Sequence, residues 1–319
     1  MSGETGQLPR ETAPSGAFTR QRSRFTERIS TDGSTGFRAE PGRYHLYVSL
    51  ACPWAHRQLI VRRLVGLTDV VSVGVVDPIR DEQGWRFTHG PGHGPDEVGG
   101  FAFLREAYTA TDPEFTGRVT VPTLWDRRTG RVVSNEFRVL DIQLATAFRS
   151  VAAQPEVDLY PTALRAEIDA LDEDVYADVN NGVYRCGFAA TQEAYEDAFG
   201  RLFDRLDALD ARLARQRYLV GDQLTLADIR LFTTLVRFDA VYYSHFKCNR
   251  RRLVDYPHLW PYARDLFGRP AFRDTVDFDH IKRHYYQTHD RLNPTRIVPV
   301  GPDIDWDASH DRDSRAAAS

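Results

Sequence analysis

Short apolar runs and one amphipathic segment mark the first structured part of the chain. Residues 44–48 (YHLYV) and 70–76 (VVSVGVV) are apolar on both faces, which is typical of buried strands. Between them, apolar residues recur at three- and four-residue steps over residues 55–65, which predicts a helix with Arg57 on its solvent side. This order predicts a strand–helix–strand unit.

A second unit follows a long insertion at residues 77–118. The insertion contains a glycine-rich stretch, GPGHGPDEVGG, that lacks the Gly-Lys-Ser/Thr ending of a phosphate-binding loop. We therefore expect a flexible connection there and no nucleotide site. Residues 118–125 predict a strand interrupted by Pro122, and residues 131–133 predict a short strand before a helix. Two such units in sequence are the pattern of a thioredoxin-like domain.

From about residue 160 the hydrophobic pattern is helical throughout. Apolar residues follow three- and four-residue steps over residues 168–179 and 195–213, and Thr225 with Asp228 resembles a capping box. A mixed sheet followed by an all-helical part resembles the layout of the glutathione transferases. The expected fold class is α/β plus all-α, with an N-terminal thioredoxin-like domain and a C-terminal helical domain.

These patterns predict four parts of the chain. The expected parts are an extended N-terminal arm at 1–40, a thioredoxin-like domain at 41–150, an all-helical domain at 160–290 and a C-terminal extension at 291–319. The arm is poor in aliphatic residues, so we expect a flexible terminus, with an arm that wraps around the protein as the alternative.

Composition excludes several classes of partner. The 319 residues include 41 Lys plus Arg and 45 Asp plus Glu, and a net charge of −4 gives no overall attraction to nucleic acid or anionic membranes. No apolar run approaches the ~18 residues of a membrane span. The amino terminus lacks the apolar region of a secretory signal, and the three cysteines are too few and too scattered for a disulfide framework. We expect a soluble, cytoplasmic protein.

Cys52 lies at a chemically special position in this pattern. It follows the first predicted strand and precedes Pro53, which suits the first turn of a helix. Unpaired N–H groups and the positive end of a helix dipole stabilise a thiolate, the reactive form of cysteine. Ala55 stands where a Cys-x-x-Cys motif has its second sulfur, so a mixed disulfide on Cys52 needs an external thiol to resolve it. We expect a one-cysteine catalyst.

A set of longer segments resembles one known family. In order, the chain carries RYHLYVSLACPWAHR, GRVTVP, NNGVY, LADIRL, TTLVRFD, HFKC, VDFDHI and LNPTRI. Together these segments are similar to those of the glutathionyl-hydroquinone reductases, the Xi class of glutathione transferases. The resemblance runs from about residue 37 to residue 302 and is highly specific because all the segments occur in the family's order.

The resemblance implies a thiol-dependent reductase. Family members use a cysteine thiolate to attack the sulfur of a glutathionyl group on a hydroquinone ring. The hydroquinone leaves, and a second glutathione releases the first one as glutathione disulfide. The resemblance implies Cys52 as the nucleophile, with Tyr184 and Tyr285 facing the aromatic substrate. A phenol with a pKa near ~10 stays protonated at neutral pH and can donate to a hydroquinone oxygen.

The resemblance also implies residues that bind the thiol, which is the cosubstrate, while no metal is expected. Trp85 would stack over the thiol peptide, and Val121, before a cis-proline at Pro122, would pair its backbone with the ligand. Glu136 would take the ligand's ammonium group, and Arg118 is a weaker candidate for a carboxylate. The aromatic thioether conjugate is the expected partner molecule, and the family resemblance suggests a homodimer.

Phe137 departs from the family pattern. The family has Asn-Glu-Ser where this chain has Asn135-Glu136-Phe137, so a hydroxyl that would bind the ligand's α-carboxylate has become a phenyl ring. An unpaired carboxylate would cost ~1–3 kcal/mol. Either a neighbouring group replaces the hydroxyl, or the thiol is another one, such as mycothiol. The strong preference for arginine over lysine fits a GC-rich bacterium, and some of these use mycothiol.

Two further function classes stay open from the residues. A glutaredoxin-like thiol transferase acting on mixed disulfides would need Cys52 but not the tyrosines. A non-catalytic binding protein on this scaffold is less favoured, because serine at position 52 would serve it equally well.

Other conspicuous residues have structural alternatives. His280 and His284 have a spacing that can bind zinc, but they lack acidic or cysteine ligands at motif spacing, which favours a packed helix. Tyr242 either lines the aromatic pocket or fills the core. His56 either influences Cys52 or faces solvent.

Overall fold

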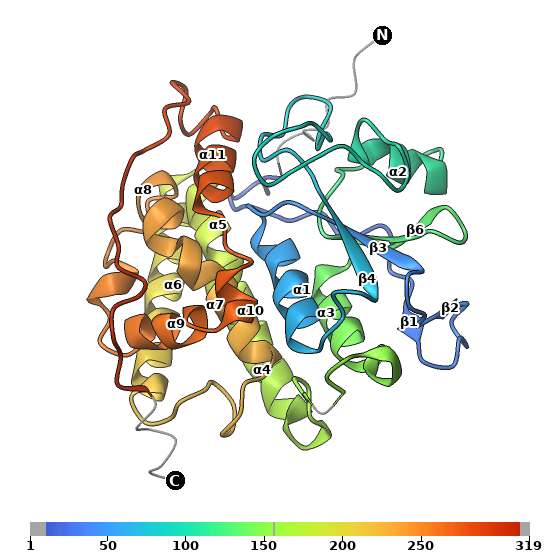
Figure 1. The fold of residues 1–319 in the computed structure, drawn as a ribbon. Coiled ribbons are helices and arrows are strands. Elements are labelled where there is room, and N and C mark those ends of the chain that lie inside the picture. Colours follow the sequence, from blue (N-terminus) through green and yellow to red (C-terminus); the bar gives the residue numbers. More distant parts are fainter. Residues whose placement is uncertain (1–10, 156, 313–319) are drawn as a thin grey trace.

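The computed structural model describes residues 11–155 and 157–312. A four-stranded mixed sheet forms the centre of the first domain (Figure 1), with the strand order β4-β3-β5-β6. Strand β3 pairs in parallel with β4 and antiparallel with β5. The elements of this domain are β3 (Tyr44–Val48), α1 (Pro53–Leu64), β4 (Val71–Val75), α2 (Leu104–Thr111), β5 (Thr123–Asp126), β6 (Arg131–Ser134) and α3 (Phe137–Thr146). This order confirms the predicted thioredoxin-like pattern, although β5 begins only after Pro122.

Both faces of β3 are covered, as its continuous apolar run predicts. On one face Tyr44 contacts Phe148, which follows α3, with the ring centroids 5.8 Å apart. On the other face Tyr47 contacts Phe87 of the insertion at 5.4 Å. The Tyr47 hydroxyl donates to the buried carboxylate of Asp96 (3.0 Å).

Asp96 also explains why the glycine-rich stretch is not the flexible connection expected from the sequence. Its carboxylate accepts hydrogen bonds from the backbone N–H groups of Val98, Gly99 and Phe101 (3.0–3.2 Å). One buried side chain therefore organises the loop and fixes it to the central strand. A carboxylate that accepts several backbone N–H bonds is satisfied without a cation.

The second domain is helical, as predicted. Its elements are α4 (Arg165–Val175), η3 (Tyr176–Asn180), α5 (Gly182–Gly187), α6 (Gln192–Leu213), α7 (Leu226–Arg237), η4 (Phe238–Tyr242), α8 (Tyr243–His245), α9 (Leu259–Phe267), α10 (Pro270–Arg273) and α11 (Phe278–Thr288). Helix α7 is buried along its whole length and starts with the predicted capping box of Thr225 and Asp228. In the described parts of the chain, no helix has both the length and the apolar character of a bilayer span.

Helix α1 lies between the two domains, packed against α3 and α7 (Figure 1). This packing corrects the expectation for Arg57, which is fully buried instead of facing solvent. Its Nη2 atom donates to Oδ1 of Asn180 (2.9 Å), and its guanidinium lies over the Trp54 ring at 4.9 Å. The second domain covers the face of α1 that the isolated helix would expose.

The described part of the N-terminal arm is packed against both domains, so a flexible terminus was the wrong expectation for residues 11–40. Phe25 packs against Tyr108 and Phe115 (5.1 and 6.0 Å), and Phe18 packs against Phe188 of the helical domain (5.4 Å). The backbone N–H of Ile29 donates to Gln143 of α3 (2.8 Å). Residues 1–10 of the predicted arm lie outside the described residues.

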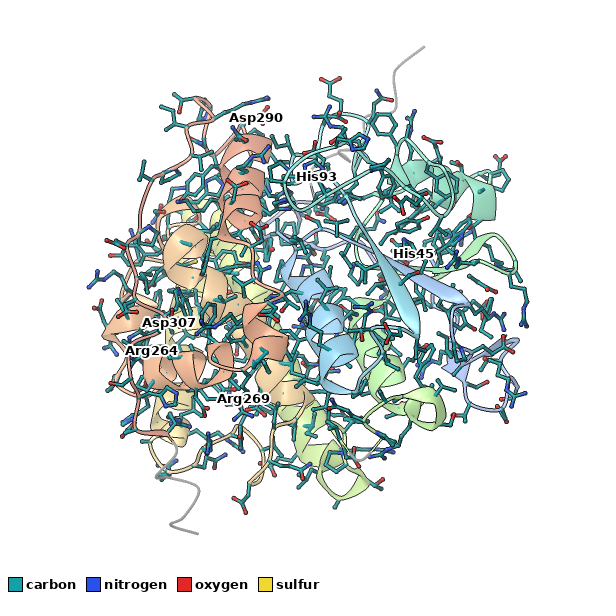
Figure 2. All side chains as sticks on the ribbon, viewed as in Figure 1. His45, His93, Arg264, Arg269, Asp290 and Asp307 are labelled. Carbon is teal, nitrogen blue, oxygen red and sulfur yellow. The ribbon has the colours of Figure 1, made fainter. Side chains whose placement is uncertain are left out.

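The described part of the C-terminal extension, residues 291–312, follows the outer surface of the helical domain (Figure 2). Arg264 of α9 donates to the carbonyl oxygen of Ser309 (2.8 Å), and Asp307 pairs with Arg273 of α10. The Trp306 ring lies 4.8 Å from Trp260 and 5.0 Å from Phe267. The extension is therefore held by aromatic packing as well as by charge.

The packing of the arm makes Phe25 a test of its contribution to stability. We expect Phe25→Ala to lower the free energy of unfolding by about 3 kcal/mol, because it leaves a cavity between two rings. Ile297→Ala is the control, since Ile297 is 68% exposed and should change stability by less than about 0.5 kcal/mol. Urea unfolding followed by tryptophan fluorescence measures both variants, and equal midpoints for the two would contradict the packing of the arm.

Candidate active site

Cys52 is the residue immediately before α1, as predicted. Its backbone is extended (φ −78°, ψ 119°), and Pro53 is the first residue of the helix. The carbonyl oxygen of Cys52 accepts the helical hydrogen bond from the N–H of His56 (3.0 Å). The thiol donates to the carbonyl oxygen of Val121, 3.4 Å away, and the Val121–Pro122 peptide bond is cis.

The protonation of Cys52 differs from the expectation. Burial raises the pKa of the Cys52 thiol, because a thiolate loses its hydration in the pocket. The N–H groups of Ala55 and Trp54 and the charges of Arg237 and Arg20 act in the opposite direction, but their sum is smaller. The helix start supplies the donors that the sequence predicts, and desolvation outweighs them in this pocket.

Arg237, the last residue of α7, holds the loop that carries Cys52. Its Nε atom donates to the carbonyl oxygen of Ala51 (2.9 Å), and Nη2 donates to that of Leu50 (3.0 Å). Nη1 donates to Thr233 of its own helix (2.8 Å) and to Nδ1 of His56 (3.0 Å). The helical domain thus positions the loop before the reactive sulfur through one fully buried guanidinium.

His56 is buried at this interface and does not face solvent. Because Nδ1 accepts from Arg237, Nε2 carries the ring proton and donates to Oγ1 of Thr275 (2.9 Å). Burial and the Arg237 charge hold the pKa of His56 well below its usual value, so the ring is neutral. His56 is therefore a neutral link from α1 to Arg237 of α7 and to Thr275, which follows α10.

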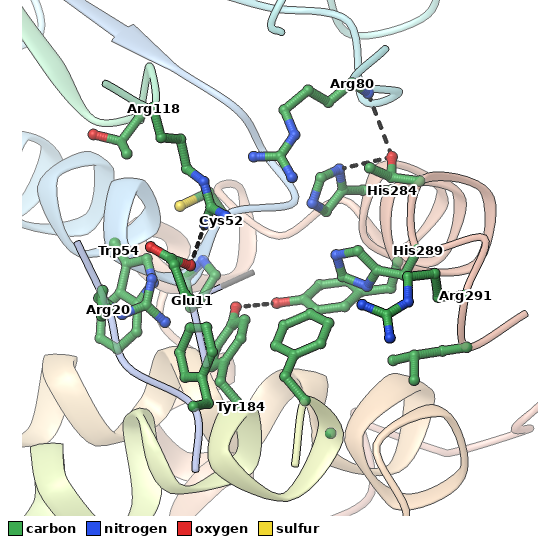
Figure 3. Close-up of a pocket in the computed structure, with 18 of the residues that line it drawn as sticks. Glu11, Arg20, Cys52, Trp54, Arg80, Arg118, Tyr184, His284, His289 and Arg291 are labelled. Carbon is green, nitrogen blue, oxygen red and sulfur yellow. Dashed lines mark hydrogen bonds and ion pairs between the residues drawn. The ribbon is translucent and has the colours of Figure 1, made fainter. Parts of the chain in front are cut away.

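A cavity of about 380 Å³ opens beside Cys52 between the two domains (Figure 3). Most of the site residues implied by the sequence or by its family resemblance line this cavity. Those on its wall are Cys52, Trp85, Arg118, Val121, Tyr184 and Tyr285. Pro122 and Glu136 do not line it. Glu136 instead caps α3, its side chain accepting from the N–H of Arg138 (3.3 Å).

Three tyrosine hydroxyls form a chain that runs from the cavity wall into the core. The Tyr184 and Tyr285 hydroxyls are 2.5 Å apart, and the Tyr285 hydroxyl is 2.9 Å from that of Tyr242. Burial raises the pKa of all three phenols, so they are protonated at neutral pH. Tyr242, which the sequence left open between pocket and core, is a fully buried partner of Tyr285 behind the wall.

Several residues on the cavity wall were not predicted from the sequence. Trp54 packs between the rings of Phe137 (4.5 Å) and Tyr184 (6.0 Å). Arg20 of the arm and Arg80 of the insertion also line the cavity. Neither arginine lies in a segment with a periodic pattern, so only the path of the chain in space brings them to the site. Trp54 is part of the CPWAHR segment, but nothing in the sequence predicted that its side chain would line the cavity.

One side of the cavity contains Trp85 and two arginines, Arg80 and Arg118. The Trp85 ring stacks on His284 with centroids 5.0 Å apart and 23° between the planes, and the Arg80 guanidinium lies 5.7 Å from the Trp85 ring. Burial and the charge of Arg118 lower the pKa of Arg80 to about 10, so it remains charged at neutral pH. Arg118 pairs with the carboxylate of Glu11 (2.7 Å), which also lines the cavity.

The histidines that have zinc-like spacing bind backbone oxygens instead. Nδ1 of His284 donates to the carbonyl of Pro78 (2.7 Å), and Nε2 of His280 donates to that of Pro91 (2.7 Å). Burial lowers the pKa of His284 to about 3. Within residues 11–155 and 157–312, no group of three or more His, Cys, Asp or Glu side chains is arranged to hold a metal ion.

The family models agree with the two domains of the structure. The glutathione S-transferase N-terminal domain model matches residues 51–140, and the glutathione S-transferase C-terminal domain model matches residues 192–265. A thioredoxin-like domain, a helical domain and a cysteine at the start of α1 in the cavity between them define a glutathione transferase.

Relatives that match over most of their length show which family of glutathione transferases this chain belongs to. The chain is 48% identical over 307 residues to glutathionyl-hydroquinone reductase YqjG of Escherichia coli, covering 94% of this chain and 93% of the relative. It is 50% identical to glutathionyl-hydroquinone reductase PcpF of Sphingobium chlorophenolicum, covering 90% of each. The chain belongs to the glutathionyl-hydroquinone reductase family, the Xi class of glutathione transferases, which confirms the resemblance.

Solved structures support the same assignment. The glutathione S-transferase Xi of Phanerochaete chrysosporium matches with a TM-score of 0.90 at 47% identity, covering 94% of this chain and 97% of that one. The glutathione-bound structure of Escherichia coli YqjG matches with a TM-score of 0.88 at 47% identity, covering 91% and 97%.

The Arg237 contacts lead to a test at Cys52. We expect Arg237→Met to raise the pKa of Cys52 further, because a positive charge that favours the thiolate is lost. Since the thiolate is the nucleophile, alkylation of Cys52 by iodoacetamide at pH 7 should slow several-fold. The measurement is the alkylation rate across a pH series, with mass spectrometry identifying the modified cysteine.

Two controls accompany this variant. Arg63→Met removes a half-exposed arginine on the same helix as the cysteine, and should leave the rate unchanged. Arg237→Lys keeps the charge and should give an intermediate rate. An unchanged titration in folded Arg237→Met would refute the electrostatic coupling.

Proposed function

We propose that this protein is a thiol-dependent reductase that removes a glutathionyl group from hydroquinone conjugates through a mixed disulfide on Cys52. One observation carries the proposal: Cys52 shares a cavity with the paired hydroxyls of Tyr184 and Tyr285. Of the described residues on the cavity wall, Cys52 alone contributes a sulfur atom. A nucleophilic sulfur beside two protonated phenols suits the transfer of sulfur away from an oxygenated ring.

The reaction balances with one protein sulfur. The Cys52 thiolate attacks the sulfur of the conjugate, an S–S bond forms, and the bond between that sulfur and the ring carbon breaks. For this step the ring is in its keto form, in which the carbon that bears the sulfur has gained a proton and a neighbouring hydroxyl has lost one. The electron pair of the broken bond restores the aromatic ring, and the phenolate oxygen that results takes up a proton to give the hydroquinone. A second thiolate then attacks the mixed disulfide and releases Cys52 as thiolate, so two thiols are oxidised as the ring is reduced.

The other cysteines do not take part in this scheme. Cys186 and Cys248 are buried, and neither lines the cavity. An external thiol must therefore resolve the mixed disulfide, as expected from Ala55 at the position of a second sulfur. The helix start, where Cys52 receives N–H donors, favours the thiolate as the leaving group of this second step.

For the thiol, the arginines of the cavity favour glutathione. Glutathione carries two carboxylates, whereas mycothiol carries none. Glu11 already places a carboxylate on Arg118. Arg80 has no carboxylate at ion-pair distance among the described residues, and its buried Nε has no hydrogen-bond partner. We propose that the thiol peptide lies along Trp85 with a carboxylate near Arg80.

Phe137 is the observation that favours mycothiol as a second candidate. Its ring packs against Trp54 (4.5 Å) and Tyr176 (6.1 Å), so it extends an aromatic wall where the family has a hydroxyl. Glu136, implied as the partner of the ligand's ammonium group, lies at the start of the same helix outside the cavity wall. Its part in binding the thiol remains a proposal, as does that of the backbone of Val121.

The proposed assembly is a homodimer in the cytoplasm, as the family resemblance suggests. Size-exclusion chromatography with light scattering would measure the mass of the assembly directly.

The tyrosine pair distinguishes the proposed activity from a general thiol transferase. We expect Cys52→Ser to abolish turnover, and Tyr285→Phe to lower kcat with a glutathionyl-hydroquinone by about 100-fold, as for loss of a general acid. Turnover of a simple mixed disulfide by Tyr285→Phe should stay close to that of the unmodified protein. Hydroquinone release, followed by chromatography, is the measurement. Retention of turnover on both substrates by Tyr285→Phe would favour the glutaredoxin-like alternative, which needs Cys52 but not the tyrosines.

A second experiment identifies the thiol. With one aromatic conjugate, we expect faster turnover with glutathione than with mycothiol, and Arg80→Met should raise KM for glutathione by about 10-fold as a charge-assisted contact is lost. Arg105→Met is the control, because Arg105 is exposed on α2 and does not line the cavity, and it should leave KM unchanged. Comparable turnover with the two thiols, together with no effect of Arg80→Met, would contradict the glutathione assignment.

A further inference from the structure

The N-terminal arm contributes a guanidinium to the active site. Arg20 lines the cavity, and its guanidinium carbon lies 4.9 Å from the ring centroids of both Trp54 and Tyr184 (Figure 3). Its Nε donates to Oδ1 of Asn181 (3.1 Å), which fixes the plane of the group. Two aromatic faces and one amide therefore hold this cation beside the phenol pair.

The remaining donors of Arg20 lack protein acceptors. Among the described residues, Nη2 is buried without a hydrogen-bond partner, and no carboxylate lies at ion-pair distance from the side chain. A buried donor without an acceptor is costly, so its presence in a cavity points to an acceptor that a ligand supplies.

The other guanidinium groups near Cys52 are already engaged or lie elsewhere. Arg237 donates to the loop carbonyls and to His56, and Arg118 pairs with Glu11. Arg80 lies against Trp85, on the side proposed for the thiol. Arg20 is thus the guanidinium that stacks on Tyr184, where the aromatic ring is expected, and its charge favours the negative forms of both Cys52 and Tyr184.

We propose that Arg20 is a catalytic residue that binds the oxyanion formed on the aromatic substrate. This inference rests on the proposed function and names the group that the leaving hydroquinone contacts. The ring reacts in its keto form, in which the carbon that bears the sulfur has gained a proton and a neighbouring hydroxyl has lost one. When the thiolate of Cys52 takes the sulfur, the electron pair of the C–S bond restores the aromatic ring and the carbonyl oxygen becomes a phenolate. Arg20 donates an N–H hydrogen bond to that oxygen and keeps its own proton, so the site selects aromatic rings that carry an ionisable hydroxyl.

Binding of two phenols of equal shape tests the oxyanion contact without any turnover. At neutral pH 2,4,6-trichlorophenol is ionised, whereas 2,4,6-trimethylphenol is neutral and of similar size. We expect the unmodified protein to bind the trichlorophenolate at least about 10-fold more tightly, as a charge-assisted hydrogen bond provides. Arg20→Gln should lower the ratio of the two affinities towards the value expected without a charged group in the pocket. Titration calorimetry measures both affinities.

Kinetics test the catalytic part. Arg20→Gln should lower kcat with a glutathionyl-hydroquinone by about 100-fold, the loss typical of an oxyanion donor, with a much smaller loss on a simple mixed disulfide, which forms no ring oxyanion. Arg20→Lys should recover part of kcat because it retains the charge. Arg22→Gln is the matched control, since Arg22 is exposed on the same arm, and should behave like the unmodified protein.

The outcomes separate the inference from the proposed function. If folded Arg20→Gln keeps the affinity ratio of the two phenols and the kcat of the unmodified protein, the inference is overturned. Equal losses of kcat on the glutathionyl-hydroquinone and on the mixed disulfide would also overturn it, because they would indicate that Arg20 only holds the arm in place. Failure of the unmodified protein to release hydroquinone would overturn the proposed function. The affinities of the two phenols could still be measured and compared. If Arg20→Gln does not fold, Arg20→Met, which keeps an apolar chain over the two rings, gives the same comparison.

Discussion

The position of the reactive sulfur depends on a contact between the domains. The buried Arg237 guanidinium of α7 binds the carbonyl groups of Leu50 and Ala51, the two residues before Cys52. A loop ending in a helix start would otherwise be held only by the sheet and helix of its own domain. Because the guanidinium comes from the helical domain, that domain and the loop that carries Cys52 are fixed to each other by direct hydrogen bonds.

This arrangement balances two opposing demands on the cysteine. A cavity that excludes water favours the neutral thiol, which is why burial raises the pKa of Cys52 despite the helix start. The same exclusion of water strengthens every hydrogen bond that a bound substrate would make to Tyr184 and Arg20. The N–H groups of Trp54 and Ala55 then matter most at the moment when charge moves on or off the sulfur, because they are already in place and need no reorganisation.

Patterns along the chain predicted the parts of the structure that depend on neighbouring residues. Strands β3 and β4, helix α1 and the long helix α6 follow from their hydrophobic periods, and Cys52 at the start of α1 follows from Pro53. Contacts between distant segments could not be predicted in this way. Arg57 lies on the polar side of an isolated helix but is buried under the second domain. The protonation of Cys52 depends on desolvation, which arises only when the cavity forms. Tyr184 and Tyr285 were named through the family resemblance alone, and the contact between their hydroxyls was not predicted, since nothing in their spacing brings them together.

The course of the N-terminal arm changes what counts as the minimal enzyme. The family model for the first domain begins at residue 51, yet Glu11, Phe18 and Arg20 belong to the cavity wall. A fragment cut at that boundary would keep the cysteine but lose strand β3, which lies between β4 and β5 in the sheet, together with one side of the pocket. Chimaeras that exchange domains between relatives, and fusions that attach a tag close to residue 11, would therefore alter substrate choice as well as stability.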